Sequence, residues 1–324
     1  MKSDVLNKEE ALAVYRKLIL ARLSEEKIQE EYFKDEMKTP VHLGIGGEAI
    51  PIGVCHSLPA KSKVFGTYRN HSLYLTMTED TDGFFGELYG KATGPGKGKA
   101  GSMHLSAPEK GIMSTSAEVG TTNPDAFGAA LANAYRKSNE IVTVFFGDGA
   151  VEEGVFWESL NFACFRQLRI LFVCEDNDLA IHTATKDRQG FKSILEAVSG
   201  FRCHGGSAEG NDVQSVIKST HQLLKKIVDD PKPAFLHASY YRFLEHVGPK
   251  EDFNAGYRKR PDPEEMDRFD PVIRFEKELC QNGCNANELD AIKKEMEAKI
   301  ARSVAAAQLA PFPAPEELYK DVFK

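Results

Sequence analysis

Residues 141–149 read IVTVFFGDG, and residues 169–177 read RILFVCEDN. Each stretch begins as a short apolar run rich in β-branched and aromatic residues, which predicts a buried β-strand. Residues 152–167, between the runs, are long enough for a helix and contain no proline. A strand, a helix and a second strand in this order form a crossover unit, so the two strands are expected to be parallel.

Polar side chains follow both runs directly. Asp148 lies between Gly147 and Gly149, and Asn177 ends the second stretch. The carboxyl ends of parallel strands are where open α/β sheets place ligands. A carboxylate and an amide oxygen suit a hard cation such as Mg²⁺, and the glycines let backbone amides approach a phosphate. A GDG sequence alone is common in proteins and does not predict a metal site. Together with Asn177 at the end of the next strand, it predicts a site for a cation and a diphosphate.

The rest of the chain alternates helical and strand patterns. Residues 9–33 and 289–304 show apolar residues at helical spacing, and residues 235–241 form another β-type run. The predicted fold is therefore α/β, with three layers and a mainly parallel sheet. We expect a single domain over residues 1–324, with an N-terminal helical segment at about 1–40 and a C-terminal helical extension at about 261–324.

Composition excludes several classes of protein. The 324 residues are 42% apolar and 27% charged, with a net charge of −7, which argues against nucleic acid as the main partner. No apolar stretch reaches the roughly 20 residues of a membrane span, and the start shows no signal-peptide core. The six cysteines form no CxxC pair, so we expect a reducing, cytoplasmic location.

Further motifs carry a family resemblance. They are Tyr68-Arg69-Asn70-His71, Gly101-Ser102-Met103-His104, the GDG and Asp176-Asn177 pair, Tyr241-Arg242 with His246, and the tail from Pro313 to Phe323. In this order they resemble the α subunit of the decarboxylating component of 2-oxo acid dehydrogenases, of the pyruvate, branched-chain and acetoin types. The resemblance covers nearly the whole chain and implies the cofactors thiamine diphosphate and Mg²⁺.

The resemblance also implies a role for each matching position. Asp148, Asn177 and the carbonyl of Leu179 would ligate Mg²⁺. The further cofactor contacts would be Tyr68 and Arg69 on the diphosphate, Gly149 and Ala150 after the metal ligand, Gly111 and Met113 on the aminopyrimidine, and Ile181 as an apolar wedge. A planar guanidinium suits a diphosphate. Without the motif, Arg69 would be taken for half of a surface ion pair, and Ile181 for a core residue.

Histidines are the candidates for proton transfer. His246 matches the active-site histidine that also touches the cofactor, although in isolation it would be taken for a solvated loop residue. His71 is a second catalytic candidate, with a purely structural hydrogen-bonding role as its equal alternative. The same two alternatives, a catalytic role and a structural hydrogen-bonding role, apply to His104.

This chain departs from the family pattern around the substrate side. Asp176 replaces the usual first asparagine, and its charge would be unfavourable beside a diphosphate unless the side chain points away. Leu179 and Ala180 replace the usual tyrosine and glycine. Leu244 stands where pyruvate-type members carry a histidine, and Val247 replaces a phosphorylatable serine, so kinase regulation at that position is excluded.

The resemblance covers only the diphosphate-binding half of a thiamine enzyme. In the two-chain family a separate β subunit supplies the glutamate that activates the pyrimidine ring, so an α₂β₂ assembly is expected. The implied reaction decarboxylates a small 2-oxo acid and passes the acyl unit to a lipoyl acyltransferase. Two alternatives stay open: a carboligase subunit that transfers a two-carbon unit to an aldehyde or sugar, and a non-catalytic subunit.

Overall fold

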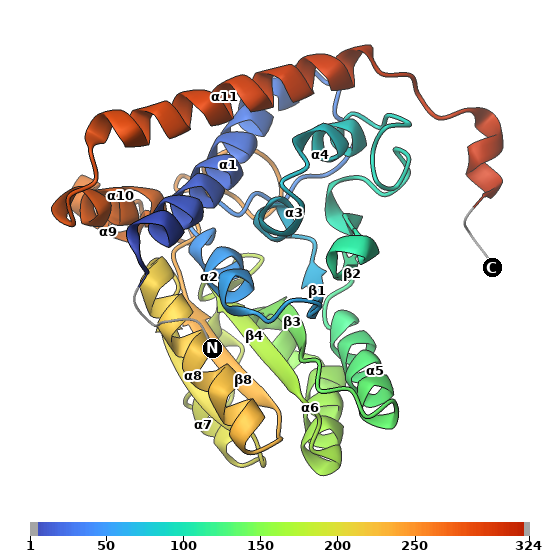
Figure 1. Cartoon of the computed structure of the whole chain (residues 1–324), viewed down its shortest axis with the longest axis vertical. Coiled ribbons are helices and arrows are strands. Elements are labelled where there is room, and N and C mark those ends of the chain that lie inside the picture. The colour runs from blue at the N-terminus through green and yellow to red at the C-terminus, as the bar shows by residue number, and fades with distance from the viewer. Residues whose placement is uncertain (1–5, 321–324) are drawn as a thin grey trace.

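A six-stranded, all-parallel sheet forms the centre of the protein in a computed structural model that describes residues 6–320. The strand order is β2-β1-β3-β4-β8-β7 (Figure 1). The strands are β1 (Lys63–Thr67), β2 (Ile112–Ser116), β3 (Val142–Gly147), β4 (Ile170–Asp176), β7 (His204–Glu209) and β8 (Ala234–Ser239). A short antiparallel hairpin of β5 (Leu179–Ala180) and β6 (Thr183–Ala184) follows β4. The predicted parallel α/β sheet is therefore confirmed.

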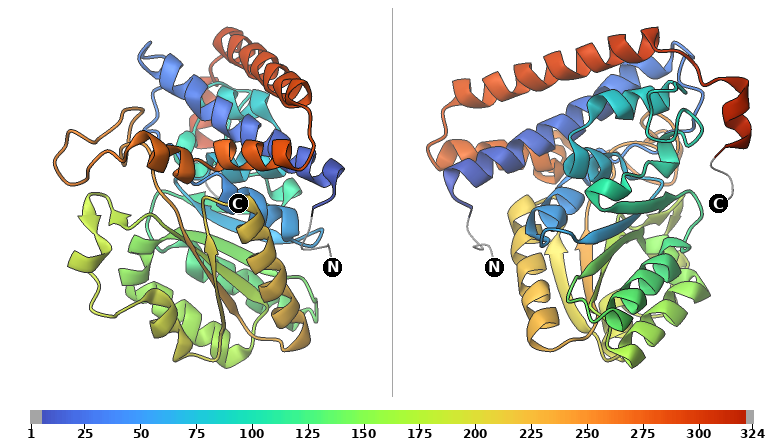
Figure 2. Two further views of the ribbon diagram at one scale, coloured as in Figure 1. Left: turned by 90° about the vertical axis from the view of Figure 1, so that its left-hand side faces the viewer. Right: turned by 45° about the vertical axis from the view of Figure 1, so that its right-hand side comes forward.

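Helices cover both faces of the sheet, giving the three layers that were predicted. One face carries α2 (Ala49–Ser57), α3 (His71–Thr78), α4 (Thr81–Leu88) and α8 (Val213–Asp229). The other carries α5 (Thr122–Tyr135), α6 (Gly154–Arg166) and α7 (Ile194–Ser199). Figure 2 shows these two helical layers on either side of the strands.

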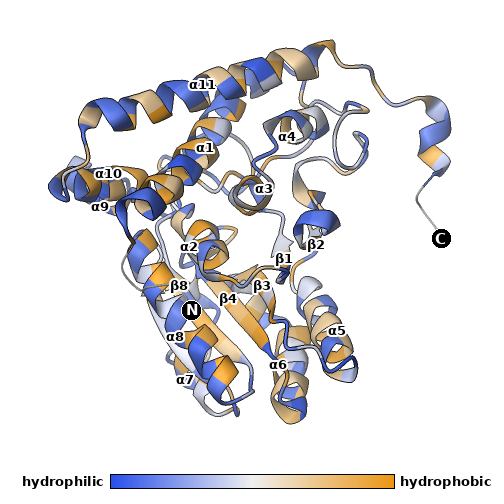
Figure 3. Cartoon of the chain, viewed as in Figure 1, coloured by the Kyte–Doolittle hydropathy of each residue, from blue (hydrophilic) through white to orange (hydrophobic). Residues whose placement is uncertain are grey.

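Alternating side chains of the strands build two separate cores. Phe145 and Val173 face the layer of α2 and α8, whereas Val144, Phe146 and Phe172 face α5 and α6. Because both faces are buried, β3 and β4 are continuously apolar, as is typical of parallel strands (Figure 3).

The two long helices lie on the outside of one layer. Helix α1 (Lys8–Tyr32) begins at an Asn7 capping box, and α11 (Ala286–Leu309) crosses it and α4 (Figure 1). The remaining C-terminal helices are α9 (Pro263–Phe269) and α10 (Pro271–Gln281), and short 3₁₀ turns lie at 102–104, 108–110, 148–152, 185–187 and 315–319. The last of these, Pro315–Tyr319, lies at the periphery of the ribbon and contacts the 97–99 loop through an ion pair of Glu317 with Lys97. None of the helices between residues 6 and 320 is long and apolar enough to cross a membrane.

The two edge strands of the six-stranded sheet were not predicted. Strand β7 has the sequence HGGSAE and forms an edge of the sheet, and β2 has the sequence IMSTS and forms the other edge. Edge strands bury fewer apolar side chains than central ones, so their sequences lack the pattern that identified β3 and β4.

Candidate active site

The carboxyl ends of β1, β2, β3, β4 and β8 surround a cavity of about 260 Å³. Asp148 and Asn177 both line it, since β3 and β4 are neighbours that pair Gly147 with Glu175. The predicted residues that the structure brings together here are Tyr68, Arg69, Asp148, Gly149, Ala150, Asn177, Leu179, Ile181 and His246. Motifs that are far apart in the sequence therefore meet at one cavity, as the family resemblance implied.

Asp148 is buried and forms an ion pair with Arg188, which comes from a later segment of the chain. Its side chain is 1% exposed, and Arg188 donates hydrogen bonds to it and to Glu152. Arg188 also donates to the backbone oxygen of Thr183 at 3.1 Å and to the hydroxyl of Thr185 at 2.9 Å. Burial and the nearby carboxylate of Asp176 nevertheless raise the pKa of Asp148 to about 6. The carboxylate is thus under-compensated, which favours an additional positive charge.

Asn177 has an oxygen with no partner. Its amide nitrogen donates to the hydroxyl of Tyr240 at 3.2 Å, but its buried Oδ1 accepts no hydrogen bond. A buried polar atom without a partner is costly unless a ligand satisfies it. Between residues 6 and 320, no three His, Cys, Asp or Glu side chains are grouped as a metal site. A cation here would therefore be held by one carboxylate and by neutral oxygens, such as the free Oδ1 of Asn177.

Asp176 points away from the cavity. One of its oxygens is 2.7 Å from Nε2 of His237, and the other accepts from the backbone of Asp178 at 2.8 Å. These hydrogen bonds lower the pKa of Asp176 despite its burial. The unusual aspartate is thus occupied within the protein, and it does not line the cavity.

Arg69 supplies positive charge to the cavity wall. It donates to the carbonyl of Leu43 at 2.6 Å and to the carbonyl of His246 at 3.1 Å, so the guanidinium joins two distant loops. Burial raises the pKa of the neighbouring Glu175 to about 8, although Arg69 opposes the shift. Glu175 therefore keeps its proton at neutral pH and adds no negative charge to the site.

Two histidines and a tyrosine pack together beside Arg69. The ring centroids of His42 and Tyr68 are 4.4 Å apart, and those of His42 and His246 are 5.3 Å apart. Burial and the nearby charge of Arg69 lower the pKa of His246 to about 4 and that of His42 to about 3. Both imidazoles are neutral at pH 7, and the buried Nδ1 of His42 has no hydrogen-bond partner. His42 was not predicted as a site residue.

The loop that carries His246 is held by a network of charged side chains. Arg258 donates to the carbonyls of Phe243 and Leu244 at 3.3 and 3.1 Å, and its Nε donates to Asp252 at 2.7 Å. Tyr257 also donates to Asp252. This network fixes the backbone next to His246 without using the imidazole itself.

Ile181 adopts an unusual backbone conformation at the rim of the cavity. It follows the β5 strand, its φ is +58°, and it is 55% exposed. A positive φ is a genuine outlier for a β-branched residue and costs of order 1–3 kcal/mol. Such strain persists only where the surrounding structure enforces it. The β5–β6 hairpin, and not the packing of the Ile181 side chain, therefore holds Ile181 at the rim of the cavity.

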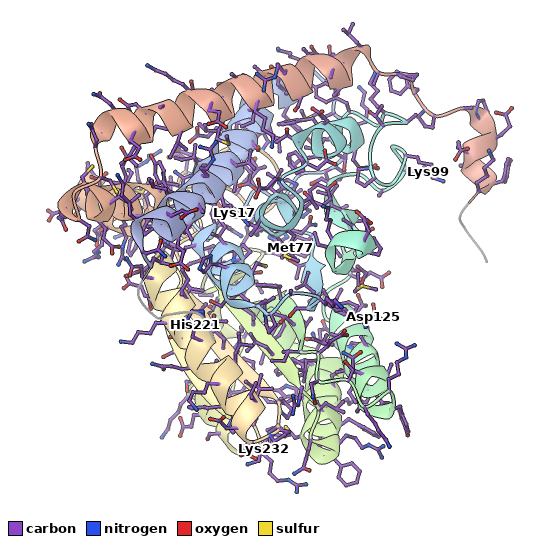
Figure 4. The ribbon with its side chains drawn as sticks, in the orientation of Figure 1. Lys17, Met77, Lys99, Asp125, His221 and Lys232 are labelled. Carbon is purple, nitrogen blue, oxygen red and sulfur yellow. The ribbon has the colours of Figure 1, made fainter. Side chains whose placement is uncertain are left out.

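Gly111 and Met113, which the family resemblance places at the cofactor, do not line this cavity. They line a separate cavity with Met77, a residue that is labelled in Figure 4. Gly111 directly precedes β2, whereas the candidate site lies beyond the carboxyl end of that strand. The residues that follow β2 and line the site are Ser116, Glu118, Val119 and Gly120. Of these residues, Gly120 is the one that the sequence could have pointed to. It is a glycine shortly before helix α5, and its φ is +82°.

His71 is a buried residue that does not line the cavity. It is 1% exposed, with its Nδ1 2.9 Å from Glu25 and its Nε2 2.6 Å from Ser102. Glu25 also accepts from the backbone of Gly44 at 2.8 Å, which fixes the loop that carries His42. His71 is therefore placed to position this loop rather than to touch a ligand. His104 is exposed, with its Nδ1 3.2 Å from the carbonyl of Thr115, and does not line the cavity.

The geometry suits a dication together with a polyanion. Asp148 and Asn177 offer oxygens to the cavity, while the half-buried Arg69 and the buried Arg242 offer positive charge to it. The remaining residues of the cavity wall that sequence patterns did not single out as ligands are Thr67, Ser116, Glu118, Val119, Gly120, Gly147, Glu152, Glu153, Glu175, Ala180, Tyr240 and Arg242.

Comparisons with known proteins agree with this geometry. Residues 16–316 match the family model described as dehydrogenase E1 component. The alpha subunit of acetoin:2,6-dichlorophenolindophenol oxidoreductase from Cupriavidus necator is 32% identical, over 98% of this chain and 95% of that protein, and the one from Bacillus subtilis is 30% identical over the same shares. The alpha subunit of the pyruvate dehydrogenase E1 component from Rhizobium meliloti is 30% identical, over 98% of this chain and 90% of that protein. The chain belongs to the dehydrogenase E1 component family.

Proposed function

We propose that the chain is the α subunit of a thiamine diphosphate-dependent 2-oxo acid dehydrogenase, of the pyruvate or acetoin type. The E1 family implies the thiamine cofactor, and both named groups of relatives are alpha subunits. The observation that carries the proposal is the convergence of Asp148, Asn177 and Arg69 at one cavity.

Mg²⁺ fits the oxygen side of the site. Asp148 is under-compensated, the Oδ1 of Asn177 has no partner, and Leu179 lines the same wall. We assign these three residues as its ligands, with the carbonyl of Leu179 as the third oxygen.

The other side of the cavity fits the cofactor. Arg69 and Tyr68 would hold the diphosphate, and the backbone of Gly149 and Ala150 lies beside it. Val119 takes the place proposed from sequence for Met113, against the aminopyrimidine. Ile181, displayed at the rim by its strained backbone, would support the bent form of the cofactor.

When bound, thiamine diphosphate supplies the electron sink for decarboxylation of a 2-oxo acid. The protein contributes position and proton transfer. His246 is neutral at pH 7 because its pKa is lowered to about 4, so its imidazole can accept a proton from substrate or cofactor. His71 holds the loop of His42 through Glu25 and takes no direct part.

A second chain would complete the site. The relatives' names as alpha subunits imply a β partner, and we propose that it carries the pyrimidine-binding half in an α₂β₂ assembly. A lipoyl acyltransferase would accept the acyl unit. All six cysteines are free thiols, which agrees with a reducing compartment such as the cytoplasm.

Asp148→Asn tests the proposal. The change keeps the size of the side chain but removes the charge that would hold the cation, so calorimetric binding of thiamine diphosphate should lose its dependence on Mg²⁺ and weaken at least about 100-fold. The matched control is Asp187→Asn, because Asp187 lies in the 3₁₀ turn at 185–187 and does not line the cavity. Unchanged Mg²⁺-dependent affinity in Asp148→Asn would contradict the proposal.

A further inference from the structure

Arg242 is a buried guanidinium with unused hydrogen-bond donors. Its side chain is among the largest fully buried ones, at 1% exposure, and it forms part of the cavity wall. Its Nε and Nη1 atoms are buried and have no hydrogen-bond partner. Only Nη2 is engaged, through long contacts to the carbonyl of Ile181 at 3.5 Å and to the hydroxyl of Tyr257 at 3.3 Å.

The nearest carboxylate does not neutralise Arg242 well. Asp252 is 3.4 Å from Nη2, but it already accepts from Nε of Arg258 at 2.7 Å and from Tyr257. Its negative charge is therefore shared with a closer guanidinium. Arg242 is left with three N–H groups, one on Nε and two on Nη1, that face no acceptor of the protein.

The other neighbours of Arg242 add to its need for an anion. Burial, together with repulsion from the nearby Arg69, lowers the pKa of Arg242 to about 10. The same two arginines depress the pKa of His246. A buried charge is normally paired, so two guanidiniums on the wall of one cavity indicate an anionic ligand between them.

We propose that Arg242 is a second oxyanion-binding residue of this cavity, whose Nε and Nη1 groups receive an oxyanion of the ligand. The proposal rests on the proposed function, which offers two sources of that chemistry: the diphosphate of the cofactor and the carboxylate of a 2-oxo acid. A guanidinium binds either group through two parallel hydrogen bonds. Arg242 thus joins Arg69 in holding negative charge, while its Nη2 stays with the loop network.

The experiment uses the full chain purified with its partner subunit. Arg242→Gln removes the charge, Arg242→Lys keeps it, and Arg260→Gln is the matched control, because Arg260 is 53% exposed and pairs with Glu251 outside the cavity. Calorimetry measures binding of inorganic pyrophosphate with Mg²⁺. Steady-state kinetics compare KM for pyruvate with KM for acetoin, which has no carboxylate.

A diphosphate contact predicts that Arg242→Gln weakens pyrophosphate binding roughly 10- to 100-fold, with a smaller loss in Arg242→Lys and none in Arg260→Gln. A carboxylate contact predicts unchanged pyrophosphate binding and a KM for pyruvate raised by a similar factor, while the KM for acetoin stays the same. Equal affinity of wild type and Arg242→Gln for every anion would overturn the inference and leave the proposed function intact. An equal loss for acetoin and pyruvate without any loss of pyrophosphate binding would show a structural role and overturn it as well. A wild-type complex that binds neither pyrophosphate nor thiamine diphosphate would overturn both.

Discussion

Ile181 gives a sharp test of whether backbone strain is built into the site. Its φ of +58° places a β-branched side chain in the left-handed region, which costs about 1–3 kcal/mol, whereas glycine adopts this region without penalty. Since Ile181 is 55% exposed, losing its side chain forfeits only about 1 kcal/mol of burial. The added flexibility of glycine in the unfolded chain costs about another 0.4–1 kcal/mol. The free energy of unfolding of Ile181→Gly should therefore stay within about 1 kcal/mol of the wild-type value.

Val247 provides the matched control. It is 47% exposed, also lies near the cavity, and has no positive φ. Val247→Gly loses similar burial and gains the same flexibility without any relief of strain, so it should be about 1–3 kcal/mol less stable than Ile181→Gly relative to wild type. Urea unfolding of the chain without cofactor measures both values.

The alanine variant separates strain from burial. Ile181→Ala removes most of the side chain but keeps the Cβ that clashes in the left-handed region, so Ile181→Gly should be the more stable of the two by about 1 kcal/mol. The wedge role predicts that both variants bind thiamine diphosphate more weakly than wild type. If Ile181→Gly were less stable than Ile181→Ala, the backbone would carry no strain and the reasoning would fail.

Three further predictions concern charge and close packing. The pKa of His246 is about 4 in the folded chain and about 6.5 in the unfolded one, so only the unfolded chain gains a proton as pH falls from 6.5 to 4. Because the imidazole is only partly buried, solvent screening reduces the effect, and we expect the free energy of unfolding to fall by roughly 1–2 kcal/mol between pH 7 and pH 4.5. In urea unfolding, His246→Gln should lose less stability over this pH interval than wild type does. In Gly46→Ala a Cβ would meet the carbonyl of Tyr241 at 2.1 Å, at a φ of +103°, so it should lower the unfolding free energy by at least about 3 kcal/mol; Gly256→Ala, with φ of +90° in open space, should cost only about 1 kcal/mol. Arg188→Gln leaves the buried carboxylate of Asp148 without its guanidinium, and should cost about 3 kcal/mol, of which Mg²⁺ restores a part; equal Mg²⁺ stabilisation of variant and wild type in the same assay would contradict this.

The sequence predicted those parts of the fold and site that depend on local pattern. Central strands β3 and β4 are buried on both faces, so their sequences are unbroken apolar runs, and Asp148 and Asn177 had to emerge at one edge of the sheet. The family prediction rested on motifs that recur in a fixed order, and the match over residues 16–316 confirmed it.

The remaining site residues depend on tertiary structure that no local pattern encodes. Arg188 lies 40 positions from Asp148 and reaches it only because the β5–β6 hairpin folds back over the strand ends. Gly111 and Met113 were placed at the cofactor by the family resemblance. Strand β2 runs from Ile112 to Ser116 before the chain reaches the cavity, so the residues of this segment that line the cavity include Val119.

The charges of the cavity are balanced only when its proposed ligands are considered together. Burial keeps Glu175 protonated, and it keeps His246 neutral, so neither contributes a charge at pH 7. Among the residues assigned to the ligands, this leaves Asp148, partly compensated by Arg188, and the guanidiniums of Arg69 and Arg242. Glu118, Glu152 and Glu153 also line the cavity, and Glu152 pairs with Arg188. A dication alone would satisfy Asp148 but add to the repulsion between the arginines, and a polyanion alone would satisfy the arginines but face the carboxylate. Because each ligand removes the obstacle to the other, binding of Mg²⁺ and of the diphosphate should be strongly cooperative, with each raising the affinity of the chain for the other by the same factor.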